Sequence, residues 1–279
     1  MKFTKMHGAG NDYVYVNGFE EQIENPAELA IQVSHRHFGI GSDGLIQILP
    51  SEVADVRMQM FNLDGSEGAM CGNGIRCVAK YAYDHGLVDR LEMAVETAAG
   101  IFSLVMFAGP SGLVTRVQVN MGEPRLTRSE IPMSGPATER AVAIPIEINN
   151  RQLEMTCVSM GNPHVVIFVA DVKEFPVTEI GSQIENHAWF PDRVNVEFVQ
   201  IVSPTEVIQR TWERGSGETF ACGTGASAVA VAGVLTGRTQ RKIVNHLRGG
   251  DLELEWLEDG PVMMTGPAVE VFNGEFDPK

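Results

Sequence analysis

Short runs of alternating or mostly apolar residues occur along the whole chain. They are rich in β-branched and aromatic side chains, which fit the half-buried surface of a sheet, so each run predicts a strand. The predicted strands cover residues 13–16, 56–61, 91–96, 102–107, 115–120, 165–169, 196–201, 206–212 and 252–256.

Two further stretches, rich in alanine and valine, predict helices. Each follows a Cys-Gly-x-Gly segment, one beginning at Cys71 and the other at Cys222. The stretches end near Gly86 and Gly237, and glycine commonly follows the last turn of a helix. Each half of the chain is therefore expected to hold one prominent helix among many strands.

The two Cys-Gly-x-Gly segments lie 151 residues apart, and the similarity extends beyond them. With this shift, seven of the twenty residues in positions 67–86 are identical to their counterparts. Average residue usage would give roughly one or two matches, so chance similarity of two glycine-rich loops explains them poorly. The same shift pairs Asn11 with Asn162, Gly44 with Asn195 and Asn62 with Glu213. We infer an internal duplication of a unit of about 120 residues.

A chain of 279 residues is long enough for two modest domains. The duplication predicts a first domain over residues 1–120, completed by residues 266–279, and a second domain over residues 121–265. The hinge is expected around residues 119–124.

Charge and hydropathy limit the classes of partner that the protein is expected to bind. The formal net charge of −15 would repel nucleic acid and anionic lipid, so we expect neither nucleic acid nor a membrane as a partner. The longest run of apolar and small residues, 226–235, is too short to span a bilayer, and the N-terminal residues do not resemble a signal peptide. We therefore expect a cytoplasmic location, with the four cysteines reduced and, since no C-x-x-C spacing occurs, no metal site.

A cysteine that opens a helix is suited to proton transfer. The positive end of the helix dipole favours the thiolate and should lower the thiol pKa. The following backbone N–H groups lack partners within the helix, and glycine lets an anionic ligand approach them. Two such sites facing each other would place two thiols around one carboxylate. One thiolate could then remove an α-proton while the opposite thiol delivers one, as racemisation of an amino acid requires.

Racemases often use a cofactor as an electron sink. The glycine-rich segments fit neither the phosphate-binding pattern G-x-x-x-x-G-K-[ST] nor a dinucleotide fingerprint, so we expect no cofactor. A cofactor-free mechanism needs water to be excluded, which a site between two domains would provide.

Taken together, the motifs of this chain resemble those of the diaminopimelate epimerase family, in the family's order and over nearly the whole sequence. They are Met6-His7-Gly8, Gly10-Asn11-Asp12, Phe61-Asn62, Asp64-Gly65-Ser66, Cys71-Gly72-Asn73-Gly74-Ile75-Arg76-Cys77, Asn120-Met121-Gly122-Glu123-Pro124, Met160-Gly161-Asn162-Pro163-His164, Asn195, Glu213-Arg214-Gly215, Glu218, Ala221-Cys222-Gly223-Thr224-Gly225-Ala226 and Thr265-Gly266-Pro267-Ala268.

The resemblance implies a fold of the α/β (α+β) class. Two pseudo-symmetric domains would each be a mostly antiparallel sheet or barrel wrapped around a central helix, with the active site in the cleft between them. It also implies a homodimer, and interconversion of LL- and meso-diaminopimelate on the route to lysine and peptidoglycan.

The same resemblance implies roles for individual residues. Cys71 and Cys222 would be the two bases, and His164 and Glu213 would adjust their pKa values. The reacting carboxylate would be held by Gly72, Asn73, Gly223 and Thr224. The remaining groups of the substrate would be bound by Asn11, Asn62, Asn162, Asn195, Glu213 and Arg214. Arg214 suits the distal carboxylate, because a guanidinium binds a carboxylate through two hydrogen bonds.

Several residues stay open on sequence grounds. Position 44 is glycine where some family members carry a glutamine that contacts substrate, so Gly44 is left out of the site. Cys77 and Cys157 are interpreted as structural residues, in a helix and a strand respectively. Arg76 could be a surface charge or part of a domain interface. Without the resemblance, His164 could equally be a structural histidine or a residue of the site.

Three other functions remain as alternatives. A proline or hydroxyproline racemase would share the two thiols but would not need Arg214. A cysteine-nucleophile hydrolase would need only one of the cysteines, with a histidine as base. A non-catalytic amino-acid binding protein would need neither thiol.

Overall fold

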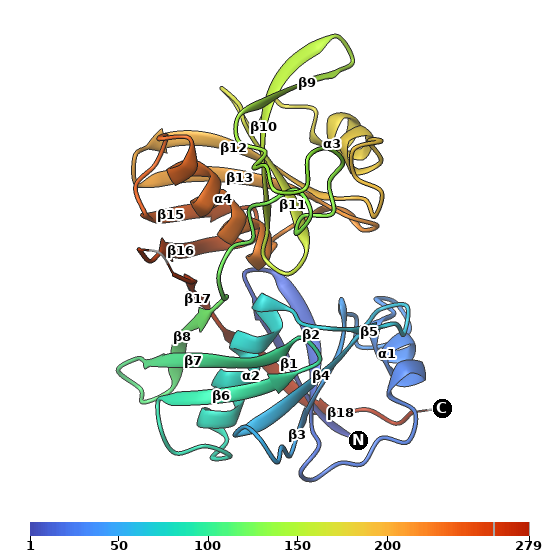
Figure 1. Cartoon of the computed structure of the whole chain (residues 1–279). Coiled ribbons are helices and arrows are strands. Elements are labelled where there is room, and N and C mark those ends of the chain that lie inside the picture. Colours follow the sequence, from blue (N-terminus) through green and yellow to red (C-terminus); the bar gives the residue numbers. More distant parts are fainter. Residues whose placement is uncertain (259, 279) are drawn as a thin grey trace. The chain divides into compact units, whose positions relative to one another are not determined.

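The structure is a computed structural model that describes residues 1–258 and 260–278. The chain forms two compact units (Figure 1). The first comprises Met1–Val119 with Thr265–Lys279, and the second comprises Asn120–Met264. The chain passes between them in β8 (Val114–Asn120) and again in β17 (Val262–Pro267).

In the first unit, a mixed sheet follows the order β18-β1-β2-β3-β4-β6-β7-β8. All neighbours are antiparallel except the pairs β2–β3 and β4–β6. Its other elements are β1 (Lys2–Gly8), β2 (Asn11–Asn17), α1 (Pro26–Ser34), β3 (Gly44–Leu49), β4 (Val56–Asn62), β5 (Glu67–Gly68), α2 (Gly72–Asp84), β6 (Glu92–Thr97), β7 (Gly100–Ala108) and β18 (Val269–Glu275).

The second unit has the corresponding order β9-β10-β11-β12-β13-β15-β16. Its elements are β9 (Ile144–Ile148), β10 (Arg151–Ser159), β11 (Pro163–Phe168), α3 (Val177–Glu185), β12 (Asn195–Ser203), β13 (Glu206–Glu213), β14 (Gly217–Thr219), α4 (Gly223–Leu235), β15 (Lys242–Leu247) and β16 (Gly250–Trp256).

The two units repeat each other in strand register. Val14 lies opposite Leu45 in the parallel pair β2–β3, and adding 151 to both numbers gives Val165 opposite Val196 in β11–β12. The shift also carries the bounds of α1 onto those of α3 and the bounds of α2 onto those of α4. After these helices the shift falls to 150, as the pairs β6–β7 and β15–β16 show. The predicted duplication is confirmed, with one residue fewer between α4 and β15.

A central helix organises each unit (Figure 1). α2 packs against β1, β2, β4, β6 and β7, and α4 packs against β10, β11, β12, β15 and β16. Because strands surround each helix, few of its side chains reach water. The residues of α2 from Gly72 to Ala82 are all buried, and so are nearly all residues of α4 from Gly223 to Gly233.

Shorter helices cover the sheets from outside. α1 packs on β2, β3 and β4, placing Leu29 and Val33 in a core with Val14, Leu45 and Phe61. Its start is fixed by Asn25, whose side chain accepts a hydrogen bond from the N–H of Glu28. α3 occupies the matching position in the second unit, against β12 and β13.

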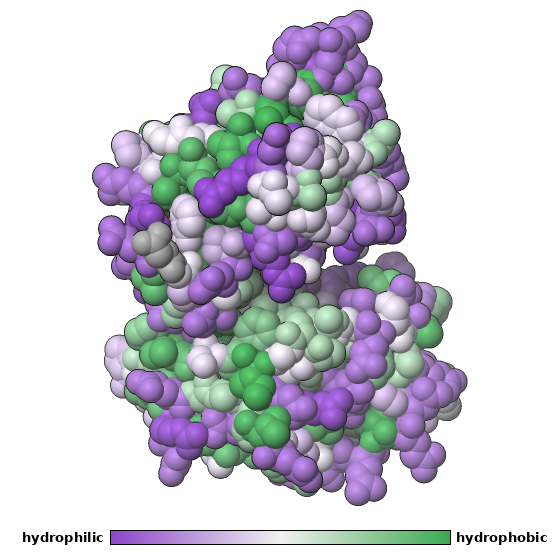
Figure 2. All heavy atoms as spheres, in the orientation of Figure 1, coloured by the Kyte–Doolittle hydropathy of each residue, from purple (hydrophilic) through white to green (hydrophobic). Residues whose placement is uncertain are grey.

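Exposed apolar residues are scattered over both units, and Phe38 is the most exposed of the large ones among the described residues. On the face in Figure 2, hydrophilic and hydrophobic residues are interspersed. Within residues 1–258 and 260–278, no helix is both long enough and apolar enough to cross a bilayer.

The predicted mixed α+β fold class is confirmed, since the structure is mostly sheet with four helices in its described part. Each of the nine predicted strands overlaps an observed one, and both long helices begin and end where the sequence predicts. Gly86 and Gly237 adopt positive φ angles of 76° and 67° just after α2 and α4, which is why glycine stands there.

Candidate active site

Cys71 caps the start of α2. Its backbone is extended, with φ −132° and ψ 116°, and its Sγ accepts a hydrogen bond from the N–H of Gly74 at 3.3 Å. The thiol also contacts Asn11 Oδ1 at 3.2 Å. The sulfur therefore lies among the first N–H groups of the helix, where the helix dipole favours negative charge.

A buried arginine holds the residues that follow Cys71. Arg76 is 0% exposed, and its guanidinium donates to Gly72 O at 2.9 Å, Asn73 Oδ1 at 3.0 Å and Pro267 O at 3.1 Å. Burial lowers the pKa of this guanidinium, while the thiols of Cys77 and Cys71 act in the opposite direction. The interpretation of Arg76 as a surface charge is wrong, because the side chain lies inside the first unit and positions Asn73.

Asp43 orients the side chain of Asn11. The amide Nδ2 of Asn11 donates to Asp43 Oδ2 at 2.8 Å, which leaves Oδ1 turned toward Cys71 and toward Asn73 Nδ2 at 3.4 Å. Burial and the neighbouring charge of Asp12 raise the pKa of Asp43. Sequence reasoning did not identify Asp43 as the partner of Asn11.

Asn62 and Gly44 lie at the same edge of the first sheet as Asn11. Gly44 begins β3 opposite Asn62, which ends β4, and β2 begins at Asn11 beside them. Asn62 Nδ2 donates to Ser66 Oγ at 3.0 Å. A Cβ at position 44 would lie 2.1 Å from Phe61 O, so the backbone excludes the glutamine of some relatives.

Cys222 opens α4 in the same backbone conformation, with φ −124° and ψ 111°. Its surroundings differ from those of Cys71: the residue is buried, with 6% exposed, and Sγ lies 3.4 Å from Thr224 Oγ1. Burial, followed by the charges of Glu213 and Glu197, raises the pKa of this thiol well above its usual value. The expected lowering is therefore wrong for Cys222, because desolvation and two carboxylates outweigh the helix dipole.

Glu213 is a carboxylate in contact with Cys222. It accepts hydrogen bonds from Thr219 Oγ1 at 2.5 Å and from the thiol of Cys222. Burial raises the pKa of Glu213, and the hydrogen bonds only partly oppose this shift. The charge of Glu213 thus opposes ionisation of Cys222, whereas the thiol of Cys222, as a hydrogen-bond donor, favours the ionised carboxylate of Glu213.

Asn195 and Arg214 lie at the adjoining strand ends. The side chain of Asn195 donates to Pro163 O at 2.9 Å and accepts from the backbone N–H of Arg214 at 2.9 Å. The guanidinium of Arg214 donates to Asp192 O at 2.8 Å through one nitrogen. A guanidinium carries five donors, so others remain for a carboxylate.

His164 lies at the start of β11 and is 0% exposed. Its Nε2 is 3.0 Å from Asn162 Oδ1, and its Nδ1 is 2.9 Å from Oε1 of Glu197, which is also 0% exposed. Sequence reasoning missed Glu197. The shift of 151 pairs Glu197 with Ile46. A charged residue therefore occupies a strand position that is apolar in the other copy, and this difference could have identified it from the sequence.

The two other cysteines are structural, as predicted. Cys77 is buried in α2 and Cys157 is buried in β10. Burial raises the pKa of Cys77 to about 11 and that of Cys157 to about 12.

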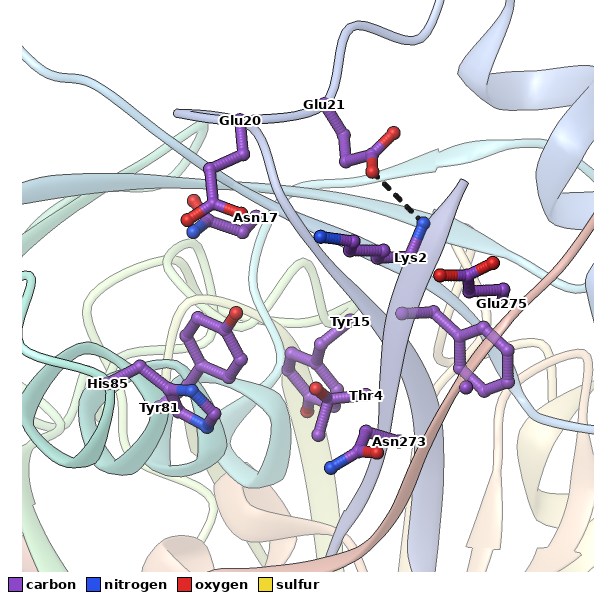
Figure 3. A pocket seen from close by; sticks show the side chains of 12 residues that line it. Lys2, Thr4, Tyr15, Asn17, Glu20, Glu21, Tyr81, His85, Asn273 and Glu275 are labelled. Carbon is purple, nitrogen blue, oxygen red and sulfur yellow. Dashed lines mark hydrogen bonds between the residues drawn. The ribbon is translucent and has the colours of Figure 1, made fainter.

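A hollow of about 300 Å³ in the first unit lies elsewhere (Figure 3). Its lining includes Lys2, Asn17, Glu20, Tyr81 and His85, and the backbone N–H of Lys2 donates to Glu21 at its rim. None of the predicted site residues lines it.

The family model described as "Diaminopimelate epimerase" matches residues 3–127 and 156–271. The chain belongs to the diaminopimelate epimerase family. Proteins named diaminopimelate epimerase from Agathobacter rectalis and Acetivibrio thermocellus are 56% and 54% identical to it, and each alignment covers 99% of both chains. A third, from Desulfovibrio desulfuricans, is 52% identical over 99% of this chain and 98% of its own.

Solved structures show the same fold at low sequence identity. A phenazine biosynthesis protein of the PhzF family from Bacillus anthracis superposes with a TM-score of 0.70 at 16% identity, covering 100% of this chain and 99% of its own. A hydroxyproline epimerase from Agrobacterium vitis also gives 0.70 at 16% identity, over 98% and 90%. At this identity the similarity concerns the fold alone.

The structure therefore brings the predicted residues of the diaminopimelate epimerase family into two half-sites, one in each unit. Asn11, Cys71 and Asn73 are joined by hydrogen bonds in the first. Asn162 with His164, Cys222 with Glu213 and Thr224, and Asn195 with Arg214 are joined in the second. Gly72 and Gly223 are the first residues of α2 and α4.

Proposed function

We propose that this chain interconverts LL- and meso-diaminopimelate without a cofactor, with Cys71 and Cys222 as the two acid–base groups. The observation that supports this most strongly is the paired design of the two units. In each, a cysteine caps the start of a central helix beside glycine and the first backbone N–H groups. The proposal requires both thiols to reach one α-carbon, from opposite faces.

The two thiols have different surroundings. Cys71 Sγ accepts a hydrogen bond from the N–H of Gly74 and, as a thiol, donates one to Asn11 Oδ1. Cys222 lies beside Glu213 and Glu197, which oppose its ionisation. In each direction one cysteine would act as the thiolate base and the other as the thiol acid, and the two roles would reverse for the opposite isomer.

The remaining residues would bind substrate. N–H groups at the starts of α2 and α4, with Asn73 and Thr224, would hold the reacting carboxylate and stabilise the enediolate as it forms. Arg214 would bind the distal carboxylate, and Glu213 a substrate ammonium. Asn11, Asn62, Asn162 and Asn195 would bind the other polar groups, from the strand ends on which they lie.

The proposal also covers the pathway, the cellular location and the oligomeric state. The reaction would serve the synthesis of lysine and of the peptidoglycan cross-linking residue, in the cytoplasm, by a homodimer that needs neither nucleic acid nor a membrane. The acidic surface is the supporting observation, with a net charge of −15.

The first test is incubation of the reduced protein with LL-diaminopimelate in D2O, with no cofactor added. We expect the meso isomer to form with deuterium at the inverted α-carbon. Absence of both deuterium uptake and meso product, with the thiols verified as reduced, would refute the proposal.

Single substitutions then assign the roles. Cys71→Ala and Cys222→Ala should each lower kcat by about a hundredfold or more, the usual contribution of a general acid or base. Cys77→Ala is the matched control, because Cys77 is a buried thiol of the same helix α2, and it should stay within a fewfold of the parent. Full activity in either of the first two variants would exclude the two-base mechanism.

A further substitution tests the substrate. Arg214→Ala should raise KM for diaminopimelate, because the distal carboxylate loses a charged hydrogen-bond donor. Unchanged kinetics would contradict the assignment of the distal pocket.

A further inference from the structure

Glu197 is a buried carboxylate to which the roles above assign no contact with substrate. It projects from β12, is 0% exposed and contacts His164 through Oε1. Its Oε2 has no hydrogen-bond partner among the described residues. Burying a carboxylate is costly unless its contacts compensate, so its presence calls for a physical reason.

Packing of the fold does not supply that reason, because the first unit has an uncharged side chain at the equivalent position. Ile46 stands at the position equivalent to Glu197. A Cβ on Gly74 would lie 2.7 Å from Ile46 Cδ1, and a Cβ on Gly225 would lie 2.4 Å from Glu197 Oε1. Both side chains thus pack against a glycine in the first turn of a central helix. Since Ile46 fills this position in the first unit, an apolar side chain is sufficient for packing there.

The hydrogen bonds of His164 show what the carboxylate adds. The ring lies between two oxygens, Asn162 Oδ1 at Nε2 and Glu197 Oε1 at Nδ1. An amide oxygen can only accept, so Nε2 must carry a proton. One further proton is shared by Nδ1 and the carboxyl group, either as an imidazolium–carboxylate pair or as an imidazole with a carboxylic acid. In both forms His164 is a donor toward Asn162.

This arrangement fixes the amide of Asn162. With Oδ1 bound to His164, its Nδ2 has no hydrogen-bond partner among the described residues and can donate to a ligand. The equivalent Asn11 is held the other way round: Asp43 binds its Nδ2, and Oδ1 faces Cys71. The two half-sites therefore present opposite ends of equivalent asparagines.

We propose that Glu197 is a positioning residue of the second half-site: it keeps the proton on Nε2 of His164 and thereby turns the NH2 group of Asn162 toward a substrate oxygen. A lone neutral histidine could adopt either tautomer, and the amide would then turn with it. The assignment of the ligand as substrate rests on the proposed function, whereas the state of His164 does not.

The first arm of the test is NMR of the full chain labelled with ¹⁵N-histidine. His164 is assigned from the signals lost in His164→Asn. We expect Nε2 of His164 to be protonated in the parent protein and to show mixed tautomers in Glu197→Gln. The matched control is Glu206→Gln, which removes a carboxylate from the pair Glu206–His246 in the same unit and should leave the His164 signals unchanged.

An unprotonated Nε2 in the parent protein would overturn the proposal, even if Glu197→Gln did not fold. Identical His164 signals in a folded Glu197→Gln variant would overturn it as well. Neither result depends on which substrate the protein turns over.

The second arm is a double-mutant cycle in diaminopimelate turnover. Glu197→Gln should raise KM about tenfold or more, the value of one hydrogen bond to a charged group, with a smaller change in kcat. In an Asn162→Ala background the same substitution should have no further effect, because the amide it orients is gone. An equal effect in both backgrounds would show that Glu197 acts by another route. A parent protein that leaves diaminopimelate unchanged would refute the proposed function and leave the NMR result to decide the role of Glu197.

Discussion

Replacing Arg76 by methionine should destabilise the first unit and leave the second unit unaffected. The guanidinium donates to three oxygens. Gly72 O keeps its helical partner in α2 after the change, but Asn73 Oδ1 and Pro267 O each lose a buried donor. An acceptor left unsatisfied in the interior costs about 1–3 kcal/mol, so we expect a loss of about 2 kcal/mol or more in the free energy of unfolding.

The second unit offers a matched control for this experiment. Ser227 stands at the equivalent position of α4, where its hydroxyl donates only to Gly223 O at 3.0 Å. That carbonyl keeps its helical partner, so Ser227→Ala should change the free energy of unfolding by less than about 1 kcal/mol.

The aromatic residues allow the two units to be followed separately. All three tryptophans (Trp189, Trp212 and Trp256) are in the second unit, and all four tyrosines lie at positions 13, 15, 81 and 83 of the first. In urea titrations of Arg76→Met, the tyrosine absorbance transition should move to lower urea while the tryptophan fluorescence transition stays in place. Equal shifts in both signals, or no shift in either, would refute the reasoning.

Two further predictions concern single positions. Gly44→Ala should cost about 1–3 kcal/mol of stability by overpacking, since its Cβ would lie 2.1 Å from Phe61 O; a melting temperature equal to that of the parent would contradict this. The hydrogen bond to Asp251 and then that to Glu206 raise the pKa of His246. Protonated His246, bound to these carboxylates, therefore stabilises the fold fully below the ordinary histidine pKa of about 6.5. This contribution is lost as pH rises through the raised pKa of His246. The stability difference between parent and His246→Gln, measured by urea unfolding across pH, should shrink toward alkaline pH, and a constant difference would exclude the linkage.

Much of the fold could be predicted because it is repeated. A cysteine, two glycines and the glycine after the helix occur twice at one spacing, and strand patterns occur in both copies. The strands β1, β3, β15, β17 and β18 were not predicted. The outer helices α1 and α3 were missed, since each is only nine residues long. The hairpin of β9 and β10 was also missed, although its turn residues Asn149 and Asn150, at φ 51° and 60°, are typical of a tight two-residue turn.

The site was less predictable where the copies differ. The pattern identified both thiols, but the burial of Cys222 and its two neighbouring carboxylates depend on which side chains a strand turns inward. Glu197 and Ile46 occupy one structural position, and only the packed structure shows that one of them partners a histidine. The burial of Arg76 could not be predicted for a similar reason. A charged residue in a helix pattern does not reveal that strands surround the helix.

The pairing of β1 with β18 has a consequence for biosynthesis. β18 follows all the other described strands in the sequence, and Met1 N hydrogen-bonds to Phe276 O across 275 positions, beside the edge-on contact of Phe3 with Phe272. A nascent chain emerging from the ribosome can pair every strand from β9 to β16 before this contact is possible. We expect the second unit to fold during translation, while the edge of β1 stays open until β18 has left the ribosome.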